Sequence, residues 1–389
     1  MTAPIAQLPP LHALALPEAA PPRRGVLRDG TSAWLVTGYH DVRQVLTDPR
    51  FVRAEDGEQK EGAALNVSTD PSSLYNQNGA GHQRLRRTVQ GAFTPRAVAQ
   101  WRPWVETVVG RLLDDLAEAG PPADLVADFT AVLPFAVAER LMGLDGLEYG
   151  QMRRWAACLT ADGAEKDGHV AADQREFTEF AAGLLAERRS RPGEDVVSRL
   201  VQAADREGGI PQEQLTFLVG GLAASGSDSV AAVLANSLLY LLGERPELWP
   251  RLAGDGQAEH ATEWLLHHIQ LGDDEFTTRQ AAKDAEIGEL RVPAGETVAI
   301  CLGSANRDPA VFPDGLSGDP LAPLPAPTLA FGAGPHYCLG TWLARTQLRT
   351  ALQHLAGRLP GLRLADPGAP VEWRLGGTTR SPRGLRALW

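Results

Sequence analysis

The segment from Pro211 to Pro246 constrains the fold more than any other part of the chain. It reads PQEQLTFLVGGLAASGSDSVAAVLANSLLYLLGERP, a length and composition that predict one long helix. Pro211 suits the first helical turn, and GERP provides the stop. A helix that is apolar almost all round must be covered by protein. We therefore expect this helix to run through the core of a helical fold.

Helical periodicity also extends over most of the chain between His82 and this segment. By contrast, residues 32–38 (SAWLVTG) predict a strand, and a short helix that ends at Pro49 follows it. Residues 285–303 alternate as a hairpin does, with the bend at residues 293–295. No repeat or linker divides the chain. We expect one mainly α-helical domain over residues 1–389 with a small β-rich part.

The charge and the terminal sequence exclude several classes of protein. The net charge of −11 lacks the basic stripe that a nucleic-acid-binding protein needs. The N-terminal residues lack the charged start, apolar middle and cleavage site of a signal peptide, and no run approaches the roughly 18 apolar residues of a membrane span. We expect a cytoplasmic protein with no nucleic-acid or membrane partner.

The three cysteines are widely spaced and form neither a disulfide framework nor a zinc-binding pair. Cys158 and Cys301 lie in apolar helical and strand patterns, which predict buried structural thiols. Cys338 lies in FGAGPHYCLG, residues 331–340. The glycines of this segment leave backbone amides able to face the sulfur, and such donors favour the thiolate.

A thiolate at Cys338 has three possible uses. A nucleophile needs a base, and the spacing of His336 in an extended loop says little about contact. A zinc ligand needs further Cys or His ligands, and the close pair His267 and His268 would diverge on a helix. The third use is as ligand to an open cofactor, and haem iron accepts a cysteine thiolate.

The decapeptide resembles the haem-binding loop of the cytochrome P450 family, in which a phenylalanine, two glycines, the axial cysteine and a final glycine have these spacings. The resemblance continues over nearly the whole chain, in AWLVTGYHDVRQVLTDPRF, GHQRLRRTVQGAFTPR and LRVPAGETVAICLGSANRDPAVFPD. It implies the cytochrome P450 fold, mainly α, with the long core helix crossing the haem. It also implies haem b (iron protoporphyrin IX) as the cofactor.

The same resemblance implies the residues that bind the cofactor. Cys338 would be the axial iron ligand, Phe331 would shield its sulfur, and Gly340 completes the motif. Four basic residues would bind the haem propionates, and they are His82, Arg86, Arg279 and His336. His82 and Arg86 are four residues apart and share one helical face.

The long helix contains SGSDS, residues 225–229, which is similar to the acid and alcohol pattern of the family. In the family the helix is locally opened there, and the pair relays protons for oxygen activation. The resemblance implies these catalytic roles for Asp228 and Ser229. Serine lacks the methyl group of the usual threonine and is less restricted in its rotamers. We expect a working but less rigid relay.

The chain departs from the family at the helix that normally carries Glu-x-x-Arg, a pair completed by an arginine in the following meander. HATEWLLHHIQ places Trp264 and His267 at these positions, and FPDGLSGDPLAPLPAPT contains no arginine. Removing all the partners avoids the roughly 3 to 5 kcal/mol that one stranded buried charge costs. We expect a replaced core, with Trp264 filling volume and His267 hydrogen-bonded.

The resemblance implies a haem-thiolate monooxygenase, or an oxidative cross-linking enzyme. Its small-molecule substrate would be a natural-product or peptide intermediate, as in antibiotic biosynthesis and other secondary metabolism. A ferredoxin-type electron donor with its reductase is the implied partner, docking near Arg345 and Arg349. The alternative is a non-catalytic homologue that stabilises another biosynthetic enzyme. The retained Cys338 and its partner residues favour the enzyme.

The fold also implies where the substrate would be contacted. We expect substrate contacts at residues 55–81, 158–170, 221–225, 271–278 and 377–379.

Overall fold

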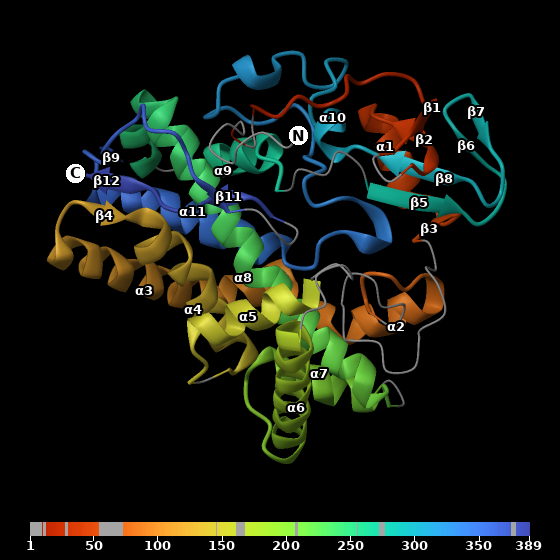
Figure 1. Ribbon diagram of the computed structural model, residues 1–389, viewed down its shortest axis with the longest axis horizontal. Coiled ribbons are helices and arrows are strands. Elements are labelled where there is room, and N and C mark those ends of the chain that lie inside the picture. The colour runs from red at the N-terminus through yellow and green to blue at the C-terminus, as the bar shows by residue number, and fades with distance from the viewer. Residues whose placement is uncertain are drawn as a thin grey trace. The chain divides into compact units, whose positions relative to one another are not determined.

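The computed structural model (Figure 1) describes residue 10 and residues 13–27, 30–53, 73–144, 146–160, 168–206, 209–254, 256–271, 277–374 and 379–389. The chain divides into two compact units. The first unit comprises Met1–Gln7, Asp56–Ala253 and Trp342–Trp389, and the second comprises Leu8–Glu55 and Gly254–Thr341. A single domain over residues 1–389 stays a prediction.

The first unit is built mainly from helices. Their bounds are α2 Gly79–Gln90, η3 Gly91–Phe93, α3 Pro95–Ala119, η4 Val126–Thr130, α4 Val132–Met142, α5 Tyr149–Thr160, α6 Gly168–Ser190, α7 Val196–Arg206, α8 Gln212–Gly243, η5 Pro246–Ala253 and α11 Thr341–Arg358. These helices confirm the helical periodicity that the sequence predicts after His82.

The long apolar segment forms α8, as predicted from its sequence. α8 contacts α4, α5 and α6, which gather along it in Figure 1. Among the described helices, α8 alone is long and apolar enough to cross a membrane. Within α8, 53% of its most apolar 18-residue stretch is buried inside the protein. The packing accounts for the apolar composition, because helices on several sides exclude water. The family's local opening at residues 225–229 is not observed, since α8 is continuous there.

The first unit also contains five short strands among the described residues, four of them near the end of the chain. They are β4 Ala123–Asp124, β9 Arg363–Leu364, β10 Trp373–Arg374, β11 Ser381–Pro382 and β12 Arg386–Leu388. β12 pairs with both β4 and β9 in a three-stranded sheet. β10 and β11 form an antiparallel pair, in which Arg374 lies opposite Ser381. We call β10, β11 and the described residues Thr379 and Arg380 the C-terminal hairpin.

The second unit contains most of the β-structure. Its elements are β1 Arg23–Val26, β2 Ser32–Val36, α1 Tyr39–Thr47, β3 Phe51–Val52, α9 Gln257–His268, β5 Thr277–Ala281, β6 Ala285–Ile287, β7 Leu290–Val292, β8 Thr297–Ile300, α10 Leu302–Ala305, η6 Gly315–Ser317 and η7 Gly334–His336. A five-stranded sheet has the order β1-β2-β8-β5-β3. The strand and helix predicted before Pro49 are confirmed as β2 and α1.

The hairpin predicted within residues 285–303 is present, but its bend lies at Gly288 and not at residues 293–295. β6 pairs with β7 across a turn at Gly288, which has a φ of 56° that favours glycine. The chain at residues 293–295 instead leads to β8, which joins β2 and β5 rather than β7. Apolar side chains on β8 and α1 then share one core, which includes Val42, Val45, Val298 and Ile300.

Candidate active site

The cysteine loop, residues 331–340, belongs to the second unit, and backbone geometry closes it. The Cys338 amide donates to the Phe331 carbonyl oxygen at 2.9 Å. Gly332 and Gly334 have φ values of 67° and 69°, which few residues other than glycine adopt. A Cβ on Gly334 would lie 2.2 Å from the Leu46 carbonyl oxygen. Glycine at this position therefore lets the loop approach the end of α1.

Cys338 differs from the other two cysteines in its exposure. The Cys338 side chain is exposed, whereas Cys158 and Cys301 are buried, as predicted for structural thiols. Burial raises the pKa of the Cys158 thiol to about 12. The Cys301 sulfur accepts from the Ser304 hydroxyl at 3.0 Å and serves as a helix cap. Of the three cysteine sulfurs, that of Cys338 is therefore the one accessible to an added ligand.

The residues predicted to bind the propionates fall in both units. His82 and Arg86 lie together on α2 in the first unit. Burial lowers the pKa of His82, and the positive charge of Arg86 lowers it further. Arg279 on β5 and His336 in the cysteine loop belong to the second unit, and Arg279 is buried. The convergence of the four residues on one haem stays a prediction.

The predicted acid and alcohol of α8 make different contacts. The Asp228 carboxylate accepts from Arg374 Nη2 at 2.7 Å and from Thr379 Oγ1 at 2.5 Å. The Ser229 hydroxyl donates to the Ser225 carbonyl oxygen of its own helix at 2.6 Å. Sequence reasoning missed the Arg374 contact, because that residue lies 146 positions away and carries no motif.

Trp264 and His267 lie in α9 and are both buried, as expected for a replaced core. The Trp264 indole stacks on His268 with ring centroids 4.0 Å apart, and the His267 ring lies 4.3 Å from that of Phe312. The expectation that His267 is hydrogen-bonded is wrong for its ring, since neither nitrogen bonds to a described residue. Its main-chain oxygen instead accepts from Asn306 Nδ2 at 3.2 Å.

Asn306 is a buried residue that the sequence reasoning missed. Its Nδ2 donates to the His267 carbonyl oxygen, and its Oδ1 accepts from the Leu329 amide at 2.8 Å. Leu329 lies two residues before the cysteine loop. A polar residue inside the hydrophobic segment AICLGSANRD was the available signal, because buried amides need partners. Asn306 thus connects α9 to the chain that enters the loop.

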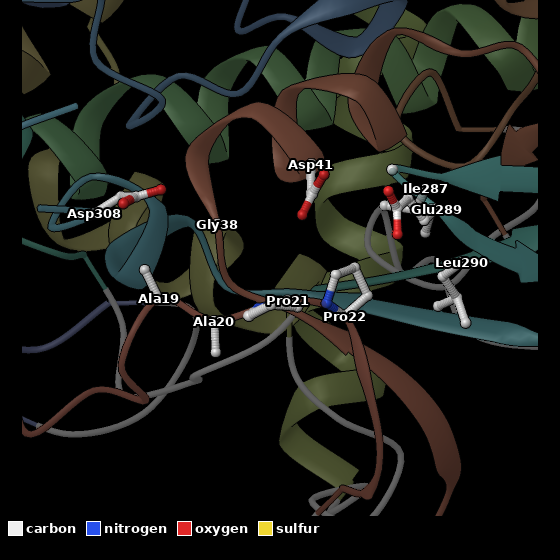
Figure 2. A pocket seen from close by; sticks show the side chains of 11 residues that line it. Ala19, Ala20, Pro21, Pro22, Gly38, Asp41, Ile287, Glu289, Leu290 and Asp308 are labelled. Atoms are coloured by element: carbon white, nitrogen blue, oxygen red, sulfur yellow. The ribbon is translucent and has the colours of Figure 1, made fainter. Parts of the chain in front are cut away.

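A separate pocket of about 670 Å³ lies in the second unit between the N-terminal segment, α1 and the β6–β7 hairpin. Figure 2 shows Asp41, Glu289 and Asp308 among the residues that line it. Burial raises the pKa of Asp41, with a contribution from Asp308. None of the residues predicted to bind haem lines this pocket. It is therefore not part of the candidate active site.

The segments expected to contact substrate are described only in part. Residues 55–72, 161–167, 272–276 and 377–378 lie outside the described residues. Residues 221–225 lie in α8, and Thr379 lies in the C-terminal hairpin, where its hydroxyl contacts Asp228.

Comparison with known proteins identifies similar chains. The family model described as Cytochrome P450 matches residues 274–358. Nocardicin C N-oxygenase from Nocardia uniformis subsp. tsuyamanensis is 39% identical over 92% of this chain and 90% of its own length. Mycinamicin IV hydroxylase/epoxidase from Micromonospora griseorubida is 36% identical over 92% and 90%. The LnmA cytochrome P450 hydroxylase from the leinamycin pathway of Streptomyces atroolivaceus S-140 has a TM-score of 0.84 and 34% identity, covering 95% of this chain and 93% of that one.

Proposed function

The chain belongs to the cytochrome P450 family, and from this premise we propose that Cys338 is the axial ligand of a haem b group. The chain is a haem-thiolate monooxygenase of the kind that modifies small-molecule natural products. The non-catalytic alternative finds no support, since these relatives are named as oxygenases and hydroxylases. The observation that carries the proposal is the exposed Cys338 sulfur, held in a loop whose glycines at positions 332 and 334 adopt the left-handed backbone conformation.

The residues present fit a haem with two carboxylate side chains. Buried His82 stands beside half-buried Arg86, and its pKa is lowered first by burial and further by the repulsion between the two basic groups. A propionate between them would relieve this repulsion and add charge-assisted hydrogen bonds. Arg279 and His336 are the corresponding donors of the second unit. A thiolate at Cys338 would balance part of the charge of the iron.

When bound, the haem supplies the redox chemistry that inserts one oxygen atom of dioxygen into the substrate. The loop holds the Cys338 sulfur in place through the bond from its own amide to Phe331. The half-buried Phe331 and Tyr337 rings, 6.5 Å apart, flank the turn of the loop before Cys338. Asp228 and Ser229 hold the protons that oxygen activation consumes.

We also propose a ferredoxin-type donor, with its reductase, as the source of electrons. Arg345 and Arg349 lie on α11, and the Arg345 guanidinium is 5.6 Å from the centre of the exposed Trp342 ring. Basic side chains next to an exposed aromatic residue suit an acidic protein partner. A cytoplasmic location agrees with a reductase that draws on NAD(P)H.

Extraction of the cofactor tests this assignment. Acid extraction of the purified protein should release one iron protoporphyrin IX per chain, identified by mass. The protein reconstituted with a ferredoxin, its reductase and NAD(P)H should add one oxygen atom from labelled dioxygen to a natural-product substrate. A protein that contains no haem after expression with a haem precursor would contradict the proposal.

A further inference from the structure

Both oxygens of the Asp228 carboxylate are occupied by donors from the C-terminal hairpin. Arg374 Nη2 donates to Oδ1 at 2.7 Å, and Thr379 Oγ1 donates to Oδ2 at 2.5 Å. All three residues belong to the first unit. Two donors on two different oxygens select one orientation of a side chain that otherwise has three staggered χ1 positions.

The hairpin that supplies these donors is anchored to α8 and to the core. Trp373, next to Arg374, is completely buried. Arg374 Nε also donates to the Ser381 hydroxyl of the paired strand at 3.3 Å. Asn236, two turns after Asp228 on α8, donates from Nδ2 to the Arg380 carbonyl oxygen at 3.1 Å. The guanidinium that meets Asp228 is therefore held from both strands.

This ion pair contributes little to the stability of the fold. The Arg374 and Asp228 side chains are 29% and 30% exposed, and pairs with such access to solvent stabilise a protein only slightly. Its larger effect is on geometry, because it fixes where the carboxylate points.

The two donors differ in what they can do when the carboxylate is protonated. A guanidinium donates only, so it cannot accept a hydrogen bond from a proton on Oδ1. A hydroxyl both donates and accepts, so Thr379 can reverse its role and accept from a proton on Oδ2. The arrangement therefore directs protonation to Oδ2.

We propose that Arg374 is a positioning residue for Asp228 and that the buried Thr379 hydroxyl stays bonded to Oδ2 in both protonation states of the carboxylate. The Asp228 side chain, which is 30% exposed, takes its proton from a solvent hydronium ion, which becomes water. Thr379 then turns its hydroxyl to accept from the new O–H on Oδ2, and Asp228 is a neutral carboxylic acid. This inference rests on the proposed proton-holding role of Asp228, and it adds the C-terminal hairpin to that role.

Paired substitutions at the two donors test the proposal in the reconstituted enzyme. R374Q should lower coupled product formation about tenfold or more, with peroxide release in its place and with an unchanged KM, and T379V should lower the coupling to a similar degree. R374K and T379S keep the donor charge and the hydroxyl, and they should recover most of the coupling. R383Q is the matched control, because Arg383 directly follows β11, donates to the Trp373 carbonyl oxygen of the hairpin, and makes no hydrogen bond or ion pair with Asp228 among the described residues.

A second measurement examines the contact itself without turnover. Hydrogen exchange of the amides at residues 379–381, followed by mass spectrometry, should accelerate in D228N and in R374Q and remain unchanged in D228E. If exchange in R374Q equals that of the wild type, Arg374 does not position Asp228. Full coupling in T379V would overturn the role of Thr379, and an R383Q enzyme as uncoupled as R374Q would overturn the specific role of Arg374. Absence of product in the wild type would instead contradict the proposed function, and the exchange result would still report on the contact.

Discussion

Asn306 and His267 are joined through the backbone: Asn306 Nδ2 donates to the His267 carbonyl oxygen at 3.2 Å, and the His267 ring bonds to no described residue. Asn306 Oδ1 also accepts from the Leu329 amide just before the cysteine loop. In α9, the helix that contains His267, His260 Nδ1 lies 3.0 Å from the carbonyl oxygen of Leu321, a residue of the meander (residues 312–328). Hydrogen bonds of an asparagine and a histidine thus connect α9, the meander and the loop where the family uses an ionic triad.

Replacing Asn306 by alanine should weaken the hold on the cysteine loop. N306A leaves the buried Leu329 amide and the His267 carbonyl oxygen without their partner, at about 1 to 3 kcal/mol for each group. We expect a lower free energy of unfolding in urea and faster loss of haem to a haem-accepting protein. N236A is the control, since Asn236 is a buried asparagine of the first unit. If N236A loses haem as quickly as N306A, the connecting role of Asn306 is wrong.

Trp264 should be a major source of packing energy in the replaced core. It is 2% exposed, and removing a buried tryptophan costs about 3 to 5 kcal/mol. W264A should therefore lower the free energy of unfolding by this amount and release haem, while W264F retains part of both. W249A removes an equally buried tryptophan of the first unit and should lower stability with less effect on haem release. Equal haem release from both alanine variants would count against a special role for Trp264.

His267 should make stability depend on pH. Burial, with the charges of His268 and Arg307, lowers the pKa of His267 from 6.5 to about 3. The unfolded chain therefore binds the extra proton between these pH values, and stability rises with pH across this window. The contribution is complete above pH 6.5, and it falls by at most about 1.4 kcal/mol per pH unit as the pH decreases. Urea unfolding between pH 7 and pH 5 should show a smaller loss for H267L than for the wild type.

The exposed His40 provides the control for that experiment, since H40L removes a histidine without opening the core. H40L should lose stability more steeply than H267L over this range, because removing this exposed histidine leaves the contribution of His267 in place. An H267L protein with an unchanged loss would show that His267 is not buried in its neutral form.

Ser229 should affect the coupling of electron use to product. Its hydroxyl donates to Ser225, so S229A removes a proton carrier without removing a tertiary contact that the structure describes. We expect less product per NAD(P)H and more peroxide in S229A, and coupling at or above the wild-type level in S229T. Ser227 makes the same kind of bond, to Ala223, and S227A should remain coupled. An S229A enzyme as coupled as the wild type would remove Ser229 from the relay.

Local pattern was sufficient to predict the elements that carry the site. The apolar length of α8 and the glycines around Cys338 both report on local backbone and burial, and the structure has them where the sequence predicts. The bend between β6 and β7 was misplaced because Pro293 and Gly295 gave a stronger turn signal than Gly288. Which strands pair is decided by the whole sheet, and the alternation of one segment does not contain that information.

The contacts missed from the sequence are all long-range. Asp228 meets Arg374 across 146 residues, and Asn306 meets His267 across 39. Nothing in the spacing of either pair marks them as partners, because tertiary packing alone brings them together. The motif predicts a role for Asp228, but only the folded chain shows what holds its carboxylate.

Ligation of the haem iron by Cys338 is the central claim, and the carbon monoxide difference spectrum of the reduced protein tests it most directly. The wild type should give the band of a thiolate-ligated haem. C158A should keep that band, because Cys158 is a buried thiol outside the cysteine loop, and C338A should lose it. A C338A protein that keeps the thiolate band, or a haem-loaded wild type that lacks it, would contradict the assignment.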